Sequence, residues 1–191
     1  MIDLFSQLEN REKLADGAVL LRGFALANEA EILNAMQDVE NDAPFRNMTT
    51  PGGFRMSVAM TNCGSFGWVT DRKGYRYSAV DPETEKPWPS MPGAFRDLAE
   101  SAADEAGYPD FLPDACLINR YEPGAKMSLH QDKDEPDFKN PIVSVSLGLT
   151  ATFQFGGLQR SDPVRTFVLH HGDVVAWGGP SLLLSHGILS L

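Results

Sequence analysis

The sequence predicts an α+β fold, with helices early in the chain and a run of strands in its second half. Residues 28–40 and 93–106 have helical periodicity, whereas the chain from residue 115 onward has the patterns of strands. Helices followed by a run of strands favour a β-sandwich with helices against it. We therefore expect one domain over residues 1–191, with a double-stranded β-helix (jelly-roll) core over 113–191 backed by the N-terminal helices.

The two helices are predicted from their apolar faces and their ends. Asn28 and Glu31 match a capping box at the start of the first helix. Its apolar face would carry Ile32, Leu33, Met36 and Val39. Gly107 is placed to end the second helix. The apolar side of that helix would carry Phe95, Leu98, Ala99, Ala102 and Ala106.

Residues 45–90, rich in Gly, Pro, Thr and aromatic residues, predict short strands and loops that form a flap over the core. The whole chain has a net charge of −10, which argues against broad, sequence-independent DNA binding. This segment alone is net positive, with six basic and four acidic residues. Basic groups interleaved with aromatic rings suit single-stranded nucleic acid, because every base offers a face for stacking. The alternative is that the aromatic residues simply pack on the core.

Strands are predicted where apolar residues alternate with polar ones or form short runs between turns. The clearest are residues 142–149, 152–155 and 174–177. Turns between them are marked by Gly156-Gly157, Gly172-Asp173 and Gly178-Gly179-Pro180.

Three residues in this strand-rich part have the spacing of a metal site. His130 and Asp132 are separated by one residue, and 53 residues lie between Asp132 and His186. In an extended segment, residues i and i+2 point to the same side, so both can reach one ion while Gln131 points away. Two imidazoles and one carboxylate cover one face of an octahedral ion and leave three positions open, as in non-haem Fe(II) oxygenases.

The alternative to a metal site is that these histidines are ordinary surface residues or hydrogen-bonded core residues. The flanking residues favour a site, because His130 follows a Pro123-Gly124 turn and His186 lies in an apolar run closed by Gly187. The neighbouring pair His170-His171 competes, but adjacent strand residues face opposite sides. We interpret both of these as structural.

Longer motifs accompany the three residues. They are Thr50–Phe54, Met60–Gly64, Pro113–Gly124, Leu129–Glu135, Pro141–Leu149 and Phe153–Gly157. In this order they resemble the bacterial AlkB family of Fe(II)- and 2-oxoglutarate-dependent dioxygenases, which repair alkylated nucleic-acid bases. The resemblance extends over nearly the whole chain.

The resemblance implies a role for each matching residue. The iron ligands, which are also the catalytic residues, would be His130, Asp132 and His186. The contacts to 2-oxoglutarate, consumed together with O2, would be Asn119 and Tyr121. The contacts to the alkylated base, in single-stranded or base-flipped DNA or RNA, would be Trp68, Tyr75, Tyr77, Asp134 and Arg160. The implied reaction demethylates bases such as 1-methyladenine and 3-methylcytosine and releases formaldehyde and succinate.

Some of these roles have plain structural alternatives. Trp68 would stack on the extruded base. Asp134 would attract a cationic methylated base in a dry pocket, or is a solvated loop charge. Arg160 would contact a phosphate or the base, or is a surface residue after a turn. Met56 and Met60 would shape the pocket floor, or fill the core.

One part of the family pattern has no match here. The family continues after the second metal histidine with a strand that carries two arginines, one of which pairs with the distal carboxylate of 2-oxoglutarate. In this chain the last arginines, Arg160 and Arg165, both precede His186. The sequence could be an incomplete copy, a truncated and silent nucleic-acid-binding product, or a chain in which Lys126 or Arg120 replaces that arginine. A cupin-like metal protein with small-molecule substrates is a further alternative, against which the aromatic, net-positive flap argues.

Composition is that of a globular protein, with 42% hydrophobic and 22% charged residues. No stretch approaches the roughly 18 apolar residues needed to span a membrane. The first residues lack the pattern of a secretory signal, and two cysteines do not make a disulfide framework. We therefore expect a cytoplasmic protein, most simply a monomer, with Cys63 and Cys116 as buried thiols.

Overall fold

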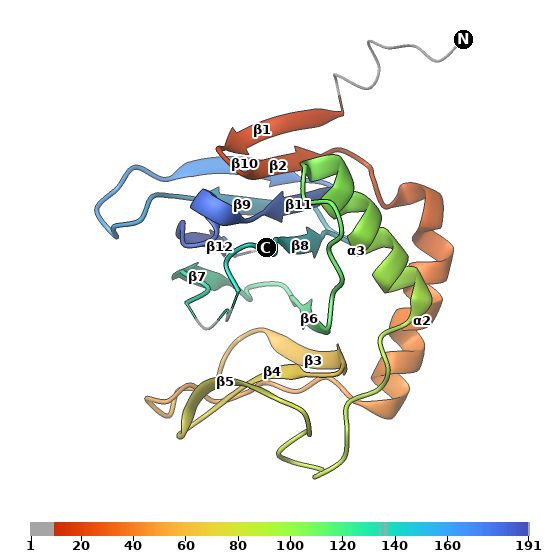
Figure 1. The fold of residues 1–191 in the computed structure, drawn as a ribbon. Helices are drawn as coiled ribbons and strands as arrows, with labels where there is room; N and C mark the ends of the chain where they lie inside the picture. The colour runs from red at the N-terminus through yellow and green to blue at the C-terminus, as the bar shows by residue number, and fades with distance from the viewer. Residues whose placement is uncertain (1–9, 134, 136, 191) are drawn as a thin grey trace.

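Two four-stranded antiparallel sheets face each other, and two helices cover the outer side of one of them (Figure 1). This computed structural model describes residues 10–133, 135 and 137–190. Within these residues, no helix is both long and apolar enough to span a membrane. The arrangement is the predicted jelly roll with helices against it.

The first sheet has the strand order β1-β2-β11-β8. Its strands are β1 (Arg11–Ala15), β2 (Ala18–Leu21), β8 (Ile142–Val145) and β11 (Val174–Trp177). Every residue of β2 and β11 is buried, because these central strands are covered on both faces. The continuous apolar runs of these two strands follow from that position.

The second sheet has the order β10-β9-β12-β7 and carries two of the predicted metal ligands. Its strands are β7 (Met127–His130), β9 (Ala151–Phe155), β10 (Arg165–Leu169) and β12 (His186–Ile188). A 3-10 turn, η2 (Gly179–Ser181), lies between β11 and β12. The main core lies between the two sheets. It contains Leu14, Ala18, Leu20, Phe153, Phe155, Phe167, Leu169, Val175, Trp177 and Leu182.

The helices are α2 (Glu29–Asp42) and α3 (Gly93–Ala106), and the 3-10 turn η1 (Leu26–Asn28) precedes α2. They pack on the first sheet through a cluster that includes Leu21, Val174, Ile32, Leu98 and Ala102. The predicted end of α3 is confirmed: Gly107 has φ +93°, the left-handed conformation that glycine adopts readily.

The predicted capping box on the first helix is wrong. Asn28 makes no side-chain cap hydrogen bond, because the chain is already coiled in η1 before α2 begins. The predicted apolar face is also narrower than expected. Ile32 and Val39 are buried, whereas Leu33 is exposed.

The 45–90 segment forms a layer at the bottom of Figure 1, and its core cluster also includes Ala43 and Ala125 from outside the segment. Strand β3 (Ala59–Gly64) pairs with β6 (Ala115–Arg120), and β4 (Gly67–Asp71) forms a hairpin with β5 (Gly74–Ser78). Trp88 is buried in this core, whereas Phe54 is 76% exposed. Some aromatic residues of this segment therefore pack in the core and others lie at the surface. Neither alternative, stacking on nucleic-acid bases or packing on the core, describes all of them.

The two cysteines lie opposite each other across β3 and β6. Cys63 is buried and Cys116 is half-buried, and both are free thiols. The prediction of buried thiols is confirmed for Cys63 and holds in part for Cys116.

Candidate active site

The second sheet brings the three predicted metal ligands together. His130 at the end of β7 is paired with His186 at the start of β12, and their ring centroids are 4.4 Å apart. The two Asp132 oxygens lie 3.6 Å from His130 Nε2 and 3.2 Å from His186 Nε2. One ligand atom from each residue falls within 4.8 Å of the others. A single ion can therefore contact all three.

Both histidines are held in the tautomer that a metal site requires. His130 Nδ1 lies 2.9 Å from the carbonyl oxygen of Ser128, and His186 Nδ1 lies 3.2 Å from that of Leu184. A carbonyl oxygen only accepts, so in each ring Nδ1 carries the hydrogen and donates it. The lone pair is then on Nε2, the atom that faces Asp132.

The surroundings of His130 favour its neutral imidazole, which is the form that binds metals. Burial lowers the pKa of His130, and the charge of His186 beside it lowers that pKa further. The rings of Trp177 and Phe153 lie 4.9 Å and 6.2 Å from the His186 ring. These apolar walls keep water away from one side of the site.

The donor set fits Fe(II) in a facial triad. It offers two nitrogens and one carboxylate oxygen, and no fourth His, Cys, Asp or Glu joins the group within the described residues. A closed structural zinc site would use four protein ligands. A three-ligand site leaves coordination positions for a co-substrate and an oxidant.

Gly187 allows β12 to approach β7 closely beside the triad. A Cβ atom at Gly187 would lie 2.6 Å from the carbonyl oxygen of Met127, a distance that real Cβ atoms essentially never show. The glycine that closed the apolar run in the sequence is therefore required by strand packing.

The predicted 2-oxoglutarate contacts lie at the end of β6. Asn119 is exposed and pairs in register with Met60, whereas Tyr121 is half-buried and packs on the core of the 45–90 segment. Burial raises the pKa of Tyr121 to about 12, so its hydroxyl stays protonated and can donate to an anionic ligand. Met60 itself is fully buried and fills the core.

Arg120, considered as a substitute for the family's arginine, is engaged elsewhere. Its guanidinium contacts Glu40 Oε1 on α2 at 2.8 Å and lies 4.4 Å from the centroid of the Phe45 ring. It is thus held towards α2. Lys126, the other residue considered as a replacement for that arginine, is exposed.

The predicted base-binding aromatics come together on the β4–β5 hairpin. Trp68 and Tyr75 are stacked, with centroids 5.6 Å apart and planes 23° apart. Trp68 is paired across the hairpin with Tyr77, whose hydroxyl donates to Glu135 Oε1. Burial raises the pKa of Tyr77, and the hydrogen bond to Glu135 raises it further. This bond joins the hairpin to the loop that follows Asp132. Asp134, predicted to contact the base, lies outside the described residues.

Asn62 was missed by the sequence analysis as a functional candidate. Its side chain is fully buried, with Nδ2 donating to Trp68 O and Oδ1 accepting from Trp68 N, both at 3.0 Å. The amide thus fixes the backbone of Trp68. Asn62 lies within one of the motifs, but only the folded chain shows which residue it bonds.

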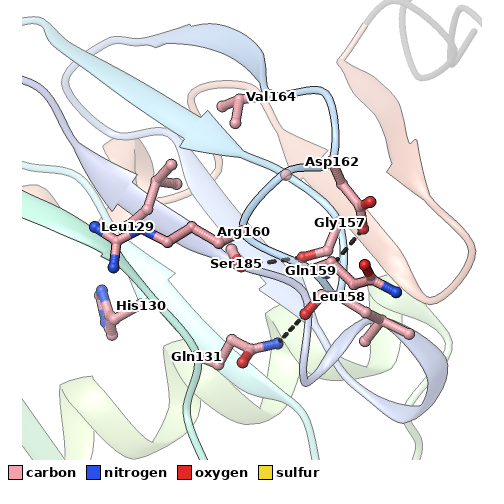
Figure 2. Close-up of a pocket in the computed structure, with 11 residues that line it drawn as sticks. Leu129, His130, Gln131, Gly157, Leu158, Gln159, Arg160, Asp162, Val164 and Ser185 are labelled. Carbon is pink, nitrogen blue, oxygen red and sulfur yellow. Dashed lines mark hydrogen bonds between the residues drawn. The ribbon is translucent and has the colours of Figure 1, made fainter.

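Arg160 lies beside the triad, in a loop over residues 156–162. A cavity of about 150 Å³ is lined by His130, Arg160 and Gln131 among others. Figure 2 shows the Arg160 side chain extending from this loop toward Leu129 and His130. An arginine here can contact an anionic group that approaches the metal site.

The other two histidines are away from this centre. His171 Nδ1 accepts from the Gly148 N–H at 2.8 Å, and its Nε2 lies 3.1 Å from Glu29. His170 lies near Thr150, 3.4 Å from its hydroxyl. These contacts are consistent with the structural role predicted for both.

Comparison with known proteins agrees with the donor set. A family model described as the 2OG-Fe(II) oxygenase superfamily matches residues 17–191. The alpha-ketoglutarate-dependent dioxygenase AlkB of Escherichia coli (strain K12) is 62% identical over 192 residues, which cover 100% of this chain and 89% of that protein. This chain belongs to the AlkB family.

Further AlkB relatives agree in sequence and in fold. The alpha-ketoglutarate-dependent dioxygenase AlkB of Salmonella typhimurium is 58% identical, with the same coverage of the two chains. A solved structure of OsALKBH1 superposes with a TM-score of 0.83 at 29% identity, over 94% of this chain and 87% of that one. The predictions of family, fold and Fe(II)/2-oxoglutarate-dependent enzyme class are thereby confirmed.

Proposed function

We propose that this chain demethylates N-alkylated bases in DNA or RNA, such as 1-methyladenine and 3-methylcytosine, using Fe(II), 2-oxoglutarate and O2. The main support for this proposal is that His130, Asp132 and His186 converge on one point, in a chain that is 62% identical to a bacterial AlkB. The aromatic hairpin joined to the same site by the Tyr77–Glu135 bond supports a base as the substrate.

In this proposal His130, Asp132 and His186 hold the metal. Asn119 and Tyr121 donate to the oxygens of 2-oxoglutarate. Residues 45–90 serve as the nucleotide-recognition flap, and 113–191 form the catalytic jelly roll. When bound, iron with 2-oxoglutarate and O2 supplies the oxidising chemistry that converts the N-methyl group to N-hydroxymethyl, with succinate and carbon dioxide as the other products. Loss of formaldehyde and a proton then restores the unmodified ring nitrogen of the base.

The methyl group lies on the pairing edge of the base, so the nucleotide must leave the stack or already be single-stranded. Trp68, stacked on Tyr75 and anchored by Asn62, offers a preorganised aromatic surface on the flap. Stacking of this kind contributes about 1–3 kcal/mol per base. Arg160 lies where it can pair with a backbone phosphate beside the metal site.

Formaldehyde release from a methylated single-stranded oligonucleotide tests the proposal on the full chain. We expect turnover that requires both Fe(II) and 2-oxoglutarate. Asp132→Ala should abolish turnover and metal retention together, because it removes the one carboxylate of the triad. Asp38→Ala, at an exposed position on α2, is the matched control and should leave both unchanged. Oligonucleotide binding without turnover, by folded wild-type protein that retains iron, would contradict the proposal.

A further inference from the structure

Gln131, which lies between two metal ligands, has a side chain that points away from the metal site. Its Nε2 donates to the carbonyl oxygen of Leu183 at 2.6 Å and to that of Leu158 at 3.0 Å. The bond to Leu158 is drawn in Figure 2. A primary amide has two N–H groups, so both are used.

The two carbonyls belong to the segments that carry the rest of the site. Leu183 precedes Leu184, whose carbonyl accepts from His186 Nδ1 and sets its tautomer. Leu158 lies in the 156–162 loop, two residues before Arg160. One side chain thus bonds three segments: the His130–Asp132 turn, the approach to His186, and the loop that carries Arg160.

The loop and the His186 segment are also joined directly. Ser185 N and Oγ both donate to the Gly157 carbonyl at 3.0 Å, and Gly156 N donates to the Ser185 carbonyl at 2.7 Å. These bonds fix the loop to β12 but do not reach β7 or Asp132. Within the described residues, Gln131 supplies the side-chain hydrogen bonds that run from the His130–Asp132 turn to the Arg160 loop and to the segment before His186.

We propose that Gln131 is a positioning residue that orients Asp132 toward the paired histidines and holds the Arg160 loop against them. Asp132 lies beyond the end of β7, where the strand ladder no longer restrains it. A tether at the adjacent residue replaces that restraint and orients the carboxylate toward both imidazoles. Groups that orient metal ligands typically change metal affinity or activity by about 10–100-fold when removed.

The role requires a donor of this length. Gln131→Leu keeps the side-chain bulk and leaves two carbonyls without their donor. Gln131→Glu keeps the shape but presents carboxylate oxygens to carbonyl oxygens, which repel. Gln131→Asn keeps the amide but is one methylene shorter, so it can retain at most one of the two bonds.

The test measures Co(II) affinity by calorimetry and methylated-oligonucleotide affinity by fluorescence anisotropy, with circular dichroism to establish folding. Gln131→Leu and Gln131→Glu should each weaken Co(II) binding by about tenfold and oligonucleotide binding by about fivefold. Gln131→Asn should fall between them and the wild type. The controls are Gln159→Leu and Gln159→Glu, at an exposed position of the same loop, and both should bind Co(II) as the wild type does.

A structural role alone would lower the melting temperature of all three Gln131 variants while the folded protein bound Co(II) with unchanged affinity. That result would overturn the inference, as would equal weakening by the Gln159 controls. The oligonucleotide measurement rests on the proposed function, whereas the Co(II) measurement does not. A failure of demethylation in the wild type therefore leaves the positioning role open to its own test.

Discussion

A buried ion pair inside the 45–90 segment should hold that segment together. Arg46 forms a two-pronged contact with Asp81, at 2.7 Å from Nη1 and 2.6 Å from Nη2. The side chains are only 19% and 6% exposed. Removing one partner of such a pair leaves a buried charge uncompensated, which costs about 3–5 kcal/mol. Because Arg46 retains some contact with water, we expect Arg46→Met to lower the free energy of unfolding by about 3 kcal/mol.

The same segment provides a matched control. Arg76 contacts Asp71 in the same two-pronged way, at 3.0 Å and 2.8 Å, but these side chains are 34% and 39% exposed. Exposed pairs contribute about 0–1 kcal/mol, so Arg76→Met should cost that amount. Urea unfolding of both variants, followed by tryptophan fluorescence, gives the two free energies. Equal costs would refute the argument that burial decides the value of this ion pair.

The pH dependence of the Arg46 effect follows from Asp81. Burial alone would raise the pKa of Asp81, but hydrogen bonds from Arg46 and from the Glu83 N–H outweigh it and hold the pKa below its ordinary 3.8. Since the folded-state pKa is the lower one, the pair stabilises the fold fully above about pH 4 and loses this effect as the pH falls through the folded-state pKa. The difference between wild type and Arg46→Met should therefore shrink in acid. A difference that stays constant down to about pH 3 would contradict this assignment.

Two further predictions concern the hairpin that carries the aromatic residues. Asn62→Ala leaves the N–H and C=O of Trp68 without their partners. It should therefore lower the free energy of unfolding by about 2–4 kcal/mol and weaken methylated-oligonucleotide binding measured by anisotropy. Unchanged binding by the folded variant would show that Trp68 needs no such anchor. Tyr77→Phe removes the bond to Glu135, so hydrogen exchange of the hairpin amides should accelerate and the KM for the oligonucleotide should rise several-fold. Identical exchange rates would mean that this bond does not hold the hairpin in place.

The sequence by itself determined the elements whose signals are local. The helix over residues 93–106 and its glycine stop could be predicted, because helical periodicity and a left-handed end depend on neighbouring residues. The meeting of His130, Asp132 and His186 could be predicted because residues i and i+2 of an extended segment share a side, and because longer motifs accompany them. Their role as metal ligands stays a prediction. The prediction of a capping box was wrong because the chain already forms a 3-10 turn directly before the helix. A short residue pattern does not reveal that turn.

Only the tertiary structure decided which distant residues meet. The pairing of β7 with β12 placed His186 opposite His130, and the hydrogen bonds of Asn62 and Gln131 went to backbone groups that no spacing rule identifies. Arg120 had the charge for a carboxylate anchor, but packing against α2 directed it to Glu40. Side-chain direction and partner choice depend on the positions of whole strands and helices, and those positions follow from burial of the shared core rather than from any one segment.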